Sequence, residues 1–329
     1  MNTSQHPIPC GFSAATTADE VIRGVGLTGR TVIVTGGYSG LGRETARVFK
    51  QAGARVIVPA RDVDRARAAL AGTVEVEVWP MDLLDPASIS ALADRFLAES
   101  PKLDLLVNSA GIMAVPLQRD ARGVESHFAT NHLGHFQLTT RLLPALRAAR
   151  GARVVNLSSF GHRYSPVVFD DINFEHREYN PWLGYGQSKT ANVLFTVALD
   201  AREAKNGIRA FAVHPGAIVG TGLEKHIPQQ ALIDAGVLDA EGKPIIDPSR
   251  NLKTVAQGAA TSVWCAVSPQ LDGMGGVYCE NVDVASLSTF EGGAMDMADS
   301  TRQGGVMPYA IDAEAADRLW RVSEVLLQK

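Results

Sequence analysis

The sequence is poor in cysteine. It has three in 329 residues, Cys10, Cys265 and Cys279, and no two of them form a CxxC pair. An odd number without metal-ligand spacing indicates neither a disulfide framework nor a cysteine zinc site. We therefore expect a reducing compartment, with Cys265 and Cys279 as small core residues.

Long apolar runs and runs of one charge are also missing. No stretch reaches the ~20 apolar residues that a membrane-spanning helix needs, and Met1 to Glu20 has neither the basic start nor the apolar run of a signal peptide. Lys and Arg total 31 against 35 Asp and Glu, a formal net charge of −4, so nothing indicates a nucleic acid partner. These absences predict a soluble, cytoplasmic protein with no membrane span.

Strand-like and helix-like stretches alternate along the chain, in which 46% of residues are apolar. We expect strands at 31–35, 55–60, 74–79, 103–107, 153–157, 208–213 and 276–279. We expect helices at 41–52, 62–70, 85–98, 123–150 with a break near Pro144, from about 183 to 205, at 252–267 and at 313–327. This alternation predicts a parallel sheet covered by helices on both faces.

We expect a single domain over residues 1–329, because no repeat or second boundary is visible. Residues 1–27 are an N-terminal extension with a short helix near 17–23, and 283–329 are a C-terminal extension. Residues 217–252, with a short helix near 229–235, form a connection long enough to be a substrate lid.

A glycine-rich turn, TGGYSGLG, lies between the first expected strand and helix. Missing β-carbons let a backbone approach a pyrophosphate closely, and a helix N-terminus offers free amides and a positive dipole end. A purely structural glycine turn is the alternative. The residues predicted to bind a dinucleotide here are Gly36, Tyr38, Ser39, Gly40, Leu41 and Gly42.

The second strand ends at Ala60 and Arg61, where NAD-binding proteins usually place an acidic residue against the adenosine ribose. A guanidinium here suits a 2′-phosphate, and Arg43 offers a second positive charge. Solvated surface arginines are the alternative, and Asp62 is close enough to keep NAD in play. We therefore predict NADP as the cofactor, with NAD second.

Further small and polar residues follow the third and fourth strands. Asp82 and Leu83 follow the third strand, where the Asp82 carboxylate meets the adenine amino group or bonds its own backbone. Asn108, Ala110 and Gly111 follow the fourth strand within NSAG. Because strand carboxyl ends meet at one edge of a parallel sheet, these residues are predicted to line the cofactor crevice.

The segment LGYGQSKTAN places Tyr185 and Lys189 at i and i+4 of an expected helix. Such residues project from one helix face, so the ammonium is expected to lower the pKa of the phenol. A phenol tuned in this way can exchange a proton with an alcohol or a carbonyl near neutral pH. The spacing also arises by chance, so the pair needs support from the rest of the chain.

That support comes from the ends of the fifth and sixth strands. Ser158 and Ser159 end the fifth strand, and Pro215 and Gly216 follow the sixth. Adjacent strand residues point to opposite faces, so only one of the two serines can face the crevice. We favour Ser159, with Ser158 as the second choice.

These motifs together resemble the short-chain dehydrogenase/reductase family from about Leu27 onward. The family signature is carried by TGGYSGLG, NSAG, the serine and YGQSK. The stretches TNHLGHF, LSSFGH and SKTANVLF, and the 26-residue step from Ser159 to Tyr185, resemble its retinol-dehydrogenase-like branch. The resemblance implies a Rossmann-like doubly wound sheet of about seven strands in the order 3-2-1-4-5-6-7.

The resemblance also implies a catalytic tetrad of Asn131, Ser159, Tyr185 and Lys189. Tyr185 would be the general acid or base, and Ser159 would donate a hydrogen bond to the oxygen on which charge develops. Lys189 would tune Tyr185 and hold the nicotinamide ribose. Asn131 would hold a water that relays protons to Lys189.

Two positions depart from the family pattern. Ser109 stands where a second asparagine is usual. In PGAIVGTGL, Thr221 falls one residue later than usual, as if Gly220 were inserted, which weakens its implied contact with the nicotinamide carboxamide. Pro215, Gly216, Ile218 and Thr221 complete the predicted cofactor site.

The histidines give little sign of a metal. His132 and His135 have helical spacing near His127, but no carboxylate or cysteine stands at ligand spacing, so we expect no metal. Substrate contact remains open, beside solvation or core packing, for His162, His176, His226, Trp182 and Phe174.

The sequence thus predicts an NADP-dependent oxidoreductase that interconverts an alcohol with an aldehyde or ketone. The apolar lid residues Ile227, Ala231, Leu232, Ile233 and Val237 favour an apolar small-molecule substrate. The alternative is a catalytically inactive NADP(H)-sensing protein of the same fold. We also expect a homo-oligomer, a dimer or tetramer, formed through the helices containing Asn131 and Tyr185.

Overall fold

The computed structural model describes residues 5–289 and 304–328. The expected C-terminal extension therefore lies partly outside the described residues, as does the start of the N-terminal one.

The strands form one eight-stranded sheet in the order β3-β2-β1-β4-β5-β6-β7-β8. The pairs from β3 to β7 are parallel, and the short β8 pairs antiparallel with β7. The predicted doubly wound order is confirmed, with β8 added at the edge. The strands are β1 Thr31–Val34, β2 Arg55–Ala60, β3 Glu77–Pro80, β4 Leu105–Asn108, β5 Ala152–Leu157, β6 Ile208–His214, β7 Val277–Glu280 and β8 Asp283–Val284.

The central strands are apolar throughout because both sheet faces are covered. In β1, Ile33 packs into the core under α4 (Pro86–Glu99), whereas Val32 and Val34 pack into the opposite core. All three are fully buried. The β-branched run of β1 thus supplies both cores from alternate positions.

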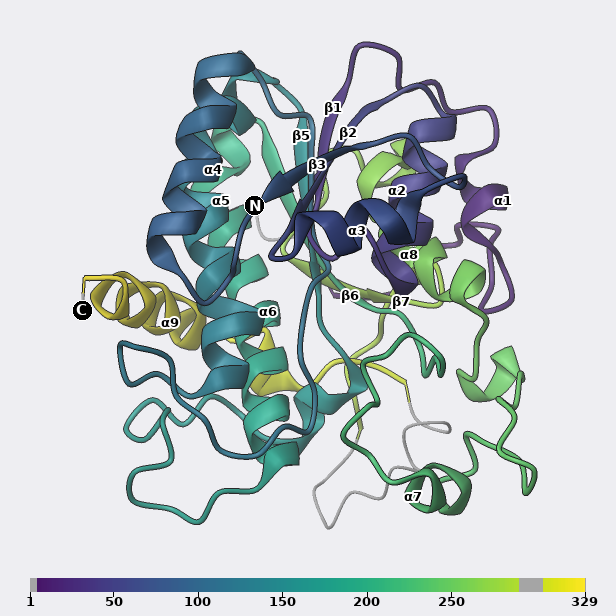
Figure 1. The fold of residues 1–329 in the computed structure, drawn as a ribbon, viewed down its shortest axis with the longest axis vertical. Coiled ribbons are helices and arrows are strands. Elements are labelled where there is room, and N and C mark those ends of the chain that lie inside the picture. The colour runs from purple at the N-terminus through teal and green to yellow at the C-terminus, as the bar shows by residue number, and fades with distance from the viewer. Residues whose placement is uncertain (1–4, 290–303, 329) are drawn as a thin grey trace.

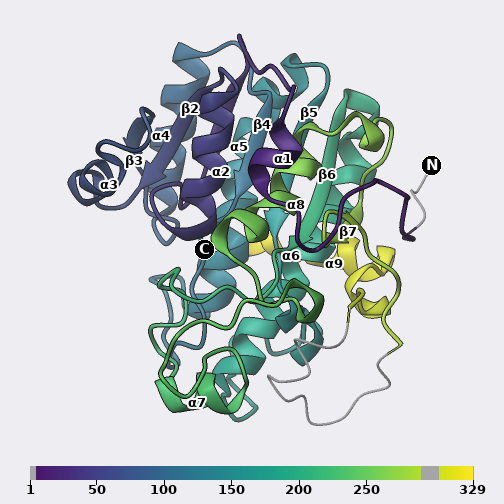
Figure 2. The same ribbon diagram turned by 90° about the vertical axis from the view of Figure 1, so that its right-hand side faces the viewer.

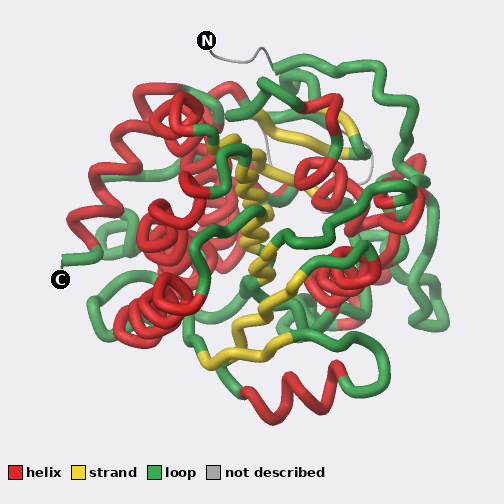
Figure 3. Tube along the Cα trace, turned by 90° about the horizontal axis from the view of Figure 1, so that it is seen from above, coloured by secondary structure: helices red, strands yellow, loops and turns green. Residues whose placement is uncertain are grey.

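Helices lie in a layer on each face of the sheet, which Figure 3 shows from above. One layer holds α4, α5 and α6, and the other holds α1, α2, α3 and α8 (Figure 1). The remaining helices are α1 Ala18–Ile22, α2 Gly40–Gln51, α3 Val63–Leu70, α5 Gly134–Ala148, α6 Pro181–Glu203, α7 Gln229–Asp234, α8 Val255–Val267 and α9 Ala313–Leu326.

Three local predictions differ from the structure. The third strand begins at Glu77, because only residues from Glu77 onward pair with β2. The helix expected from 123 begins with a π-helical turn, Phe128–Leu133, which α5 continues. Pro144 does not break α5. It lies on the exposed side of α5, where water can solvate the carbonyl that proline leaves unbonded.

The predicted lid, 217–252, projects from the helix–sheet–helix body and carries α7 (Figure 2). It has a small apolar cluster of its own around Leu232, Val237, Leu238 and Leu252. The predicted short helix is present as α7. Across the described ranges, no helix is both long and apolar enough to cross a membrane.

Helix α9 covers the outer side of α5 and α6. The Trp320 ring centroid lies 4.9 Å from that of Phe136 on α5 and 6.0 Å from that of Phe195 on α6. Arg202 on α6 stacks on Trp320 and forms an ion pair with Asp317. Packed between α9, the sheet, the π-helical turn and the turn after Ser159, α6 is buried without a break from Gly184 to Thr196.

Candidate active site

A pocket of about 450 Å³ lies at the carboxyl ends of the parallel strands. Its wall runs from the glycine turn after β1 to the start of α6 and the lid. It brings together most residues predicted from the sequence: Gly36, Tyr38, Ser39, Gly40, Leu41, Gly42, Arg61, Asp82, Leu83, Ala110, Gly111, Ser159, Tyr185, Lys189, Pro215, Gly216, Ile218 and Thr221.

The glycine turn is packed too tightly for side chains. A Cβ on Gly42 would lie 2.4 Å from the carbonyl oxygen of Gly36, which itself has a φ of +68°. Ser39 precedes α2 in an extended conformation and makes no side-chain cap bond, and the first turn of α2 holds no acidic residue. An open, positive helix end beside a bare backbone fits a dinucleotide pyrophosphate.

The adenosine side of the pocket carries one arginine and one aspartate. Arg61 lies exposed at the end of β2 and lines the pocket. Its neighbour Asp62 turns away to cap α3, accepting a hydrogen bond from the Arg65 amide at 3.0 Å. Asp82 lines the pocket and accepts from the Leu84 amide at 3.0 Å, so the predicted bond to its local backbone is present, and the contact with adenine stays a prediction.

A buried network joins β1, the NSAG loop and α5. The Thr35 hydroxyl oxygen accepts from the Ser109 and Ala110 amides at 2.9 and 3.0 Å, and the hydroxyl bonds His135 Nε2 at 2.9 Å. His135 Nδ1 lies 2.9 Å from the Asn131 carbonyl oxygen, which can only accept. His135 therefore donates from Nδ1 and accepts at Nε2. Burial lowers its pKa to about 4, so the ring stays neutral.

Two predicted asparagines lie behind the pocket wall. The Asn108 amide donates to Thr139 and Asn156 inside the sheet and helix layer. Asn131 is fully buried: its Oδ1 accepts from the Ile112 amide at 2.8 Å, and its Nδ2 donates to Ser188 at 2.9 Å. Both side chains hold neighbouring elements in place rather than line the pocket.

Both serines at the end of β5 line the pocket, but their burial and their hydroxyl contacts differ. Ser158 is buried, and its hydroxyl donates to the Lys189 carbonyl oxygen at 2.9 Å. Ser159 is partly exposed and lines the pocket beside Tyr185. Its Oγ also accepts from the Gly161 amide at 3.0 Å. The strand alternation thus turns Ser159 toward the pocket.

Tyr185 is held on three sides. A Cβ on Gly161 would lie 2.7 Å from the Tyr185 ring, and the rings of His127 and Trp182 pack edge-on at 6.1 and 6.4 Å between centroids. Burial raises the pKa of Tyr185 to about 12, against a lowering by its hydrogen bond to Ser159. In the protein alone, desolvation therefore outweighs the lowering that the sequence predicts.

Lys189 is buried beside that ring. Its Nζ lies 5.5 Å from the Tyr185 ring centroid and donates to the Leu157 carbonyl oxygen at 3.1 Å. Burial lowers the pKa of Lys189 to about 8. The pair shares one helix face as predicted, but in the protein alone burial moves both groups toward their neutral forms.

Residues from the predicted lid, 217–252, line the other side of the pocket. Of the apolar lid residues predicted to favour an apolar substrate, Ile227, Leu232 and Val237 line it. Thr221 lies against the glycine turn, 3.0 Å from where a Cβ on Gly40 would stand. Its hydroxyl donates to Glu224 at 3.2 Å.

The residues for which the sequence left substrate contact open differ in their positions. Trp182 lines the pocket, whereas Phe174 is buried against Tyr179. His162 is buried, and His176 and His226 are exposed. Within the described part of the chain, no three His, Cys, Asp or Glu side chains gather in a way that could hold a metal ion.

Sequence reasoning missed several pocket residues. The main ones are Ile112, Met113, Phe160, Tyr164 and His214. Ile112 and Met113 directly follow NSAG, and His214 ends β6, so position alone was a usable signal for these three. Phe160 and Tyr164 lie in the connection between Ser159 and Tyr185, whose path no local pattern specifies.

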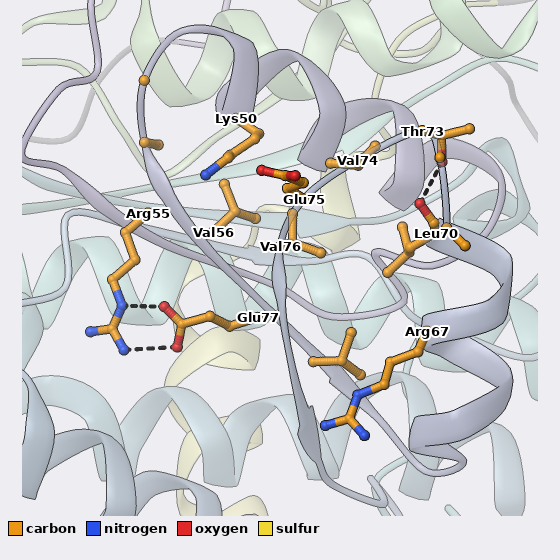
Figure 4. A pocket seen from close by; sticks show the side chains of 15 residues that line it. Lys50, Arg55, Val56, Arg67, Leu70, Thr73, Val74, Glu75, Val76 and Glu77 are labelled. Carbon is orange, nitrogen blue, oxygen red and sulfur yellow. Dashed lines mark hydrogen bonds and ion pairs between the residues drawn. The ribbon is translucent and has the colours of Figure 1, made fainter.

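A second, open hollow of about 870 Å³ lies beside β2 and β3, at their opposite ends (Figure 4). Its most prominent charged groups are already paired, since Arg55 contacts Glu77 through two hydrogen bonds of 2.6 and 2.9 Å. The predicted site residues lie in the other pocket, so we take the smaller pocket as the candidate active site.

Comparisons with known proteins agree with this architecture. The sequence profile described as short chain dehydrogenase matches residues 30–232. The chain is 44% identical over 300 residues to "Probable oxidoreductase" of Streptomyces lividans, covering 89% of this chain and 96% of that protein. It is 36% identical over 310 residues to retinol dehydrogenase 12 of Homo sapiens, covering 92% and 88%. A crystal structure of an uncharacterized protein from Mycobacterium paratuberculosis matches with a TM-score of 0.70 and 33% identity, covering 94% and 97%.

Proposed function

Because the chain belongs to the short-chain dehydrogenase/reductase family of NAD(P)-dependent oxidoreductases, we propose that it interconverts an alcohol with an aldehyde or ketone, using NADP. The observation that supports this most directly is that Ser159 and Tyr185 lie side by side in the pocket wall, with Lys189 buried beside the Tyr185 ring. Two neighbouring hydroxyls in one pocket can both bind a single substrate oxygen.

The proposed mechanism assigns one role to each residue. Tyr185 gives its phenolic proton to the carbonyl oxygen during reduction and takes it back during oxidation. Ser159 donates a hydrogen bond to the same oxygen as charge develops. The Lys189 ammonium favours the phenolate that remains. The nicotinamide, when bound, supplies or accepts the hydride.

Asn131 acts in this proposal through position. Its side chain fixes Ile112 in the pocket wall and Ser188, one residue before Lys189. Its carbonyl oxygen faces His135 Nδ1. The proton relay through a water held by Asn131 remains a proposal.

The choice of NADP depends on Arg61. Replacing Arg61 with Ala should raise the KM for NADPH about tenfold and leave that for NADH nearly unchanged, because only NADPH carries the 2′-phosphate. Arg65→Ala is the matched control, since Arg65 is an exposed arginine on α3 outside the pocket. Equal effects of Arg61→Ala on the two cofactors would contradict the assignment.

We propose an apolar carbonyl compound as substrate. Ile227, Leu232, Val237 and Trp182 give the lid side of the pocket apolar surface beside the Tyr185 hydroxyl. Matched aldehydes of increasing chain length should therefore show a falling KM.

The experiment that tests the function is NADPH oxidation with a panel of apolar aldehydes and ketones. Tyr185→Phe should reduce kcat by at least about a thousandfold, while NADPH still binds with an unchanged Kd in a fluorescence titration. Retained turnover in this variant would refute the mechanism. A wild type that binds NADPH but reduces nothing would instead support the alternative, a nucleotide-sensing protein.

A further inference from the structure

The turn that follows Ser159 is hydrogen-bonded to a part of the chain that is distant in sequence. After Ser159 the chain forms a 3-10 turn, Phe160–Tyr164. Residues 304–311, from the C-terminal extension, pass along the side of this turn away from the pocket, and their contacts join residues about 140 positions apart.

His162 is the centre of these contacts and is fully buried. Its Nδ1 lies 2.7 Å from the Ser159 carbonyl oxygen, and its Nε2 lies 3.1 Å from the Met307 amide nitrogen. A carbonyl can only accept and an amide N–H can only donate, so the ring donates from Nδ1 and accepts at Nε2. One neutral imidazole therefore links the backbone of the serine to the backbone of the C-terminal segment.

Neighbouring groups strengthen the same connection. The Tyr309 hydroxyl donates to the His162 carbonyl oxygen at 2.8 Å. Arg163 Nη2 donates to the carbonyl oxygens of Gly304 and Gly305, and the half-buried Glu280 on β7 accepts from the Gly305 amide at 2.6 Å. The segment is thus fixed to both the serine turn and the sheet.

We propose that His162 is a positioning residue through which residues 304–311 fix Ser159 for catalysis. This inference rests on the proposed function, because it assigns Ser159 the substrate oxygen. The Ser159 side chain accepts from the Gly161 amide and lies beside Tyr185, so a displaced Ser159 backbone moves the hydroxyl relative to the phenol. The C-terminal segment then contributes to turnover without touching the pocket.

Met307 allows a test that removes a single hydrogen bond. Its φ of −68° is compatible with proline. Apart from the methionine side chain, Met307→Pro removes only the amide N–H that donates a hydrogen bond to His162 Nε2. Met307→Ala loses the same side chain but keeps the N–H, so it is the matched control. We expect Met307→Pro to lower kcat about tenfold relative to Met307→Ala, with the Kd for NADPH and the melting temperature nearly equal in the two variants.

The pH profile separates positioning from a purely structural effect. The titratable groups around Tyr185 are Lys189 on α6, His127 before the π-helical turn, and Tyr278 on β7. Met307→Ala loses the same side-chain packing on the cluster that contains Tyr278, so a shift in pKa seen only in Met307→Pro is assigned to the lost hydrogen bond of His162. The rate of alcohol oxidation should rise with pH. We expect this rise to occur at higher pH in Met307→Pro than in the wild type, and at the wild-type pH in Met307→Ala.

Two substitutions of His162 divide its roles. His162→Asn keeps a donor near the Ser159 carbonyl and loses the acceptor for Met307, whereas His162→Gln does the reverse. Because the proposal requires both hydrogen bonds of the His162 ring, both variants should lower kcat about tenfold. Both should also shift the rise of the oxidation rate to higher pH, as Met307→Pro does. Wild-type rates and profiles in Met307→Pro and in both His162 variants would overturn it.

Hydrogen exchange tests the link independently of turnover. The amides of Gly161 and His162 are hydrogen-bonded to Ser159, at Oγ and at the carbonyl oxygen. We expect these amides to exchange about tenfold faster in Met307→Pro than in Met307→Ala. If no carbonyl compound is reduced, the proposed function fails, and equal exchange in the two variants separately overturns the link.

Discussion

Lys189 is a buried cation with little to balance its charge. Burial alone accounts for the lowering of its pKa to about 8, from an ordinary 10.5. The unfolded chain therefore binds this proton more tightly than the folded one, and folding stability should rise as pH rises from about 8 to 10.5. The residue that we propose prepares Tyr185 for proton transfer thus costs stability at neutral pH.

Lys189→Met should consequently stabilise the protein while abolishing turnover. We expect the free energy of unfolding at pH 7 to rise by up to about 3 kcal/mol, from the shift in pKa. The Leu157 carbonyl oxygen keeps a partner, because the Asn192 amide also donates to it at 2.8 Å. Urea unfolding at pH 7 and pH 10 checks this. A gain that does not shrink at pH 10 would assign the stabilisation to packing instead.

The Tyr185 and Lys189 pairing also marks a limit of local sequence reasoning. The i, i+4 spacing predicted a shared helix face, and the structure has it. The direction of the pKa shift was wrong for the protein alone, because the spacing carries no information on burial. Burial at Tyr185 comes in part from Gly161 and His127, which lie on other segments, beside Trp182 on the same helix.

At the level of elements, a threonine hydroxyl joins β1, β4 and α5. Thr35 ends the β1 run, accepts from two amides of the NSAG loop and bonds His135. His135 in turn donates to the carbonyl of Asn131 in the π-helical turn, a form of helix that often marks functional sites. The cofactor loop and the helix behind it therefore depend on one oxygen atom.

Thr35→Val tests this dependence without a change in shape. It leaves two partly buried amides and one buried imidazole nitrogen without their protein partner, so the free energy of unfolding should fall by about 2–4 kcal/mol. Thr35→Ser keeps the hydroxyl and should lose much less. Chemical denaturation of both variants gives the comparison, and equal losses would show that the methyl group matters more than the hydroxyl.

Elements with a strong local signal were predictable, and those that tertiary contacts decide were not. The β1 run and the Asp85–Pro86 start of α4 hold because local chemistry alone specifies them. The beginning of β3 depends on which residues β2 can pair with. Pro144 stays inside α5 because packing of the helix outweighs one missing hydrogen bond.

At the scale of the whole molecule, α9 occupies the surface on which an oligomer was expected. The sequence led us to expect a dimer or tetramer through the helices containing Asn131 and Tyr185. The middle of α6 is buried, and Trp320 of α9 packs against both Phe136 and Phe195. Association through this face therefore requires α9 to leave it.

We accordingly expect light scattering to give the mass of one chain, 35.1 kDa. Trp320→Ala should loosen α9, uncover apolar surface on α5 and α6, and promote association that grows with protein concentration. A wild-type dimer whose mass is unaffected by this substitution would show that the chain associates through another surface.

The contacts that complete the active site were the least predictable from the sequence. Glycine turn, NSAG, Ser159 and the Tyr185 helix are each readable locally, and the parallel sheet brings them together. The bond between His162 and the Met307 amide spans 145 residues and involves a backbone donor, so no residue type signals it.

The order of synthesis determines when the contact between His162 and the Met307 amide can form. Residues 304–326 are synthesised after all eight strands, and at ~5–20 residues per second Met307 follows the end of β8 by ~1–5 s. A nascent chain can therefore form its sheet and its nucleotide cleft while Ser159 still lacks its support. On our proposal, full turnover begins only once translation has passed Met307, so a prematurely terminated chain would bind nucleotide and remain a poor catalyst.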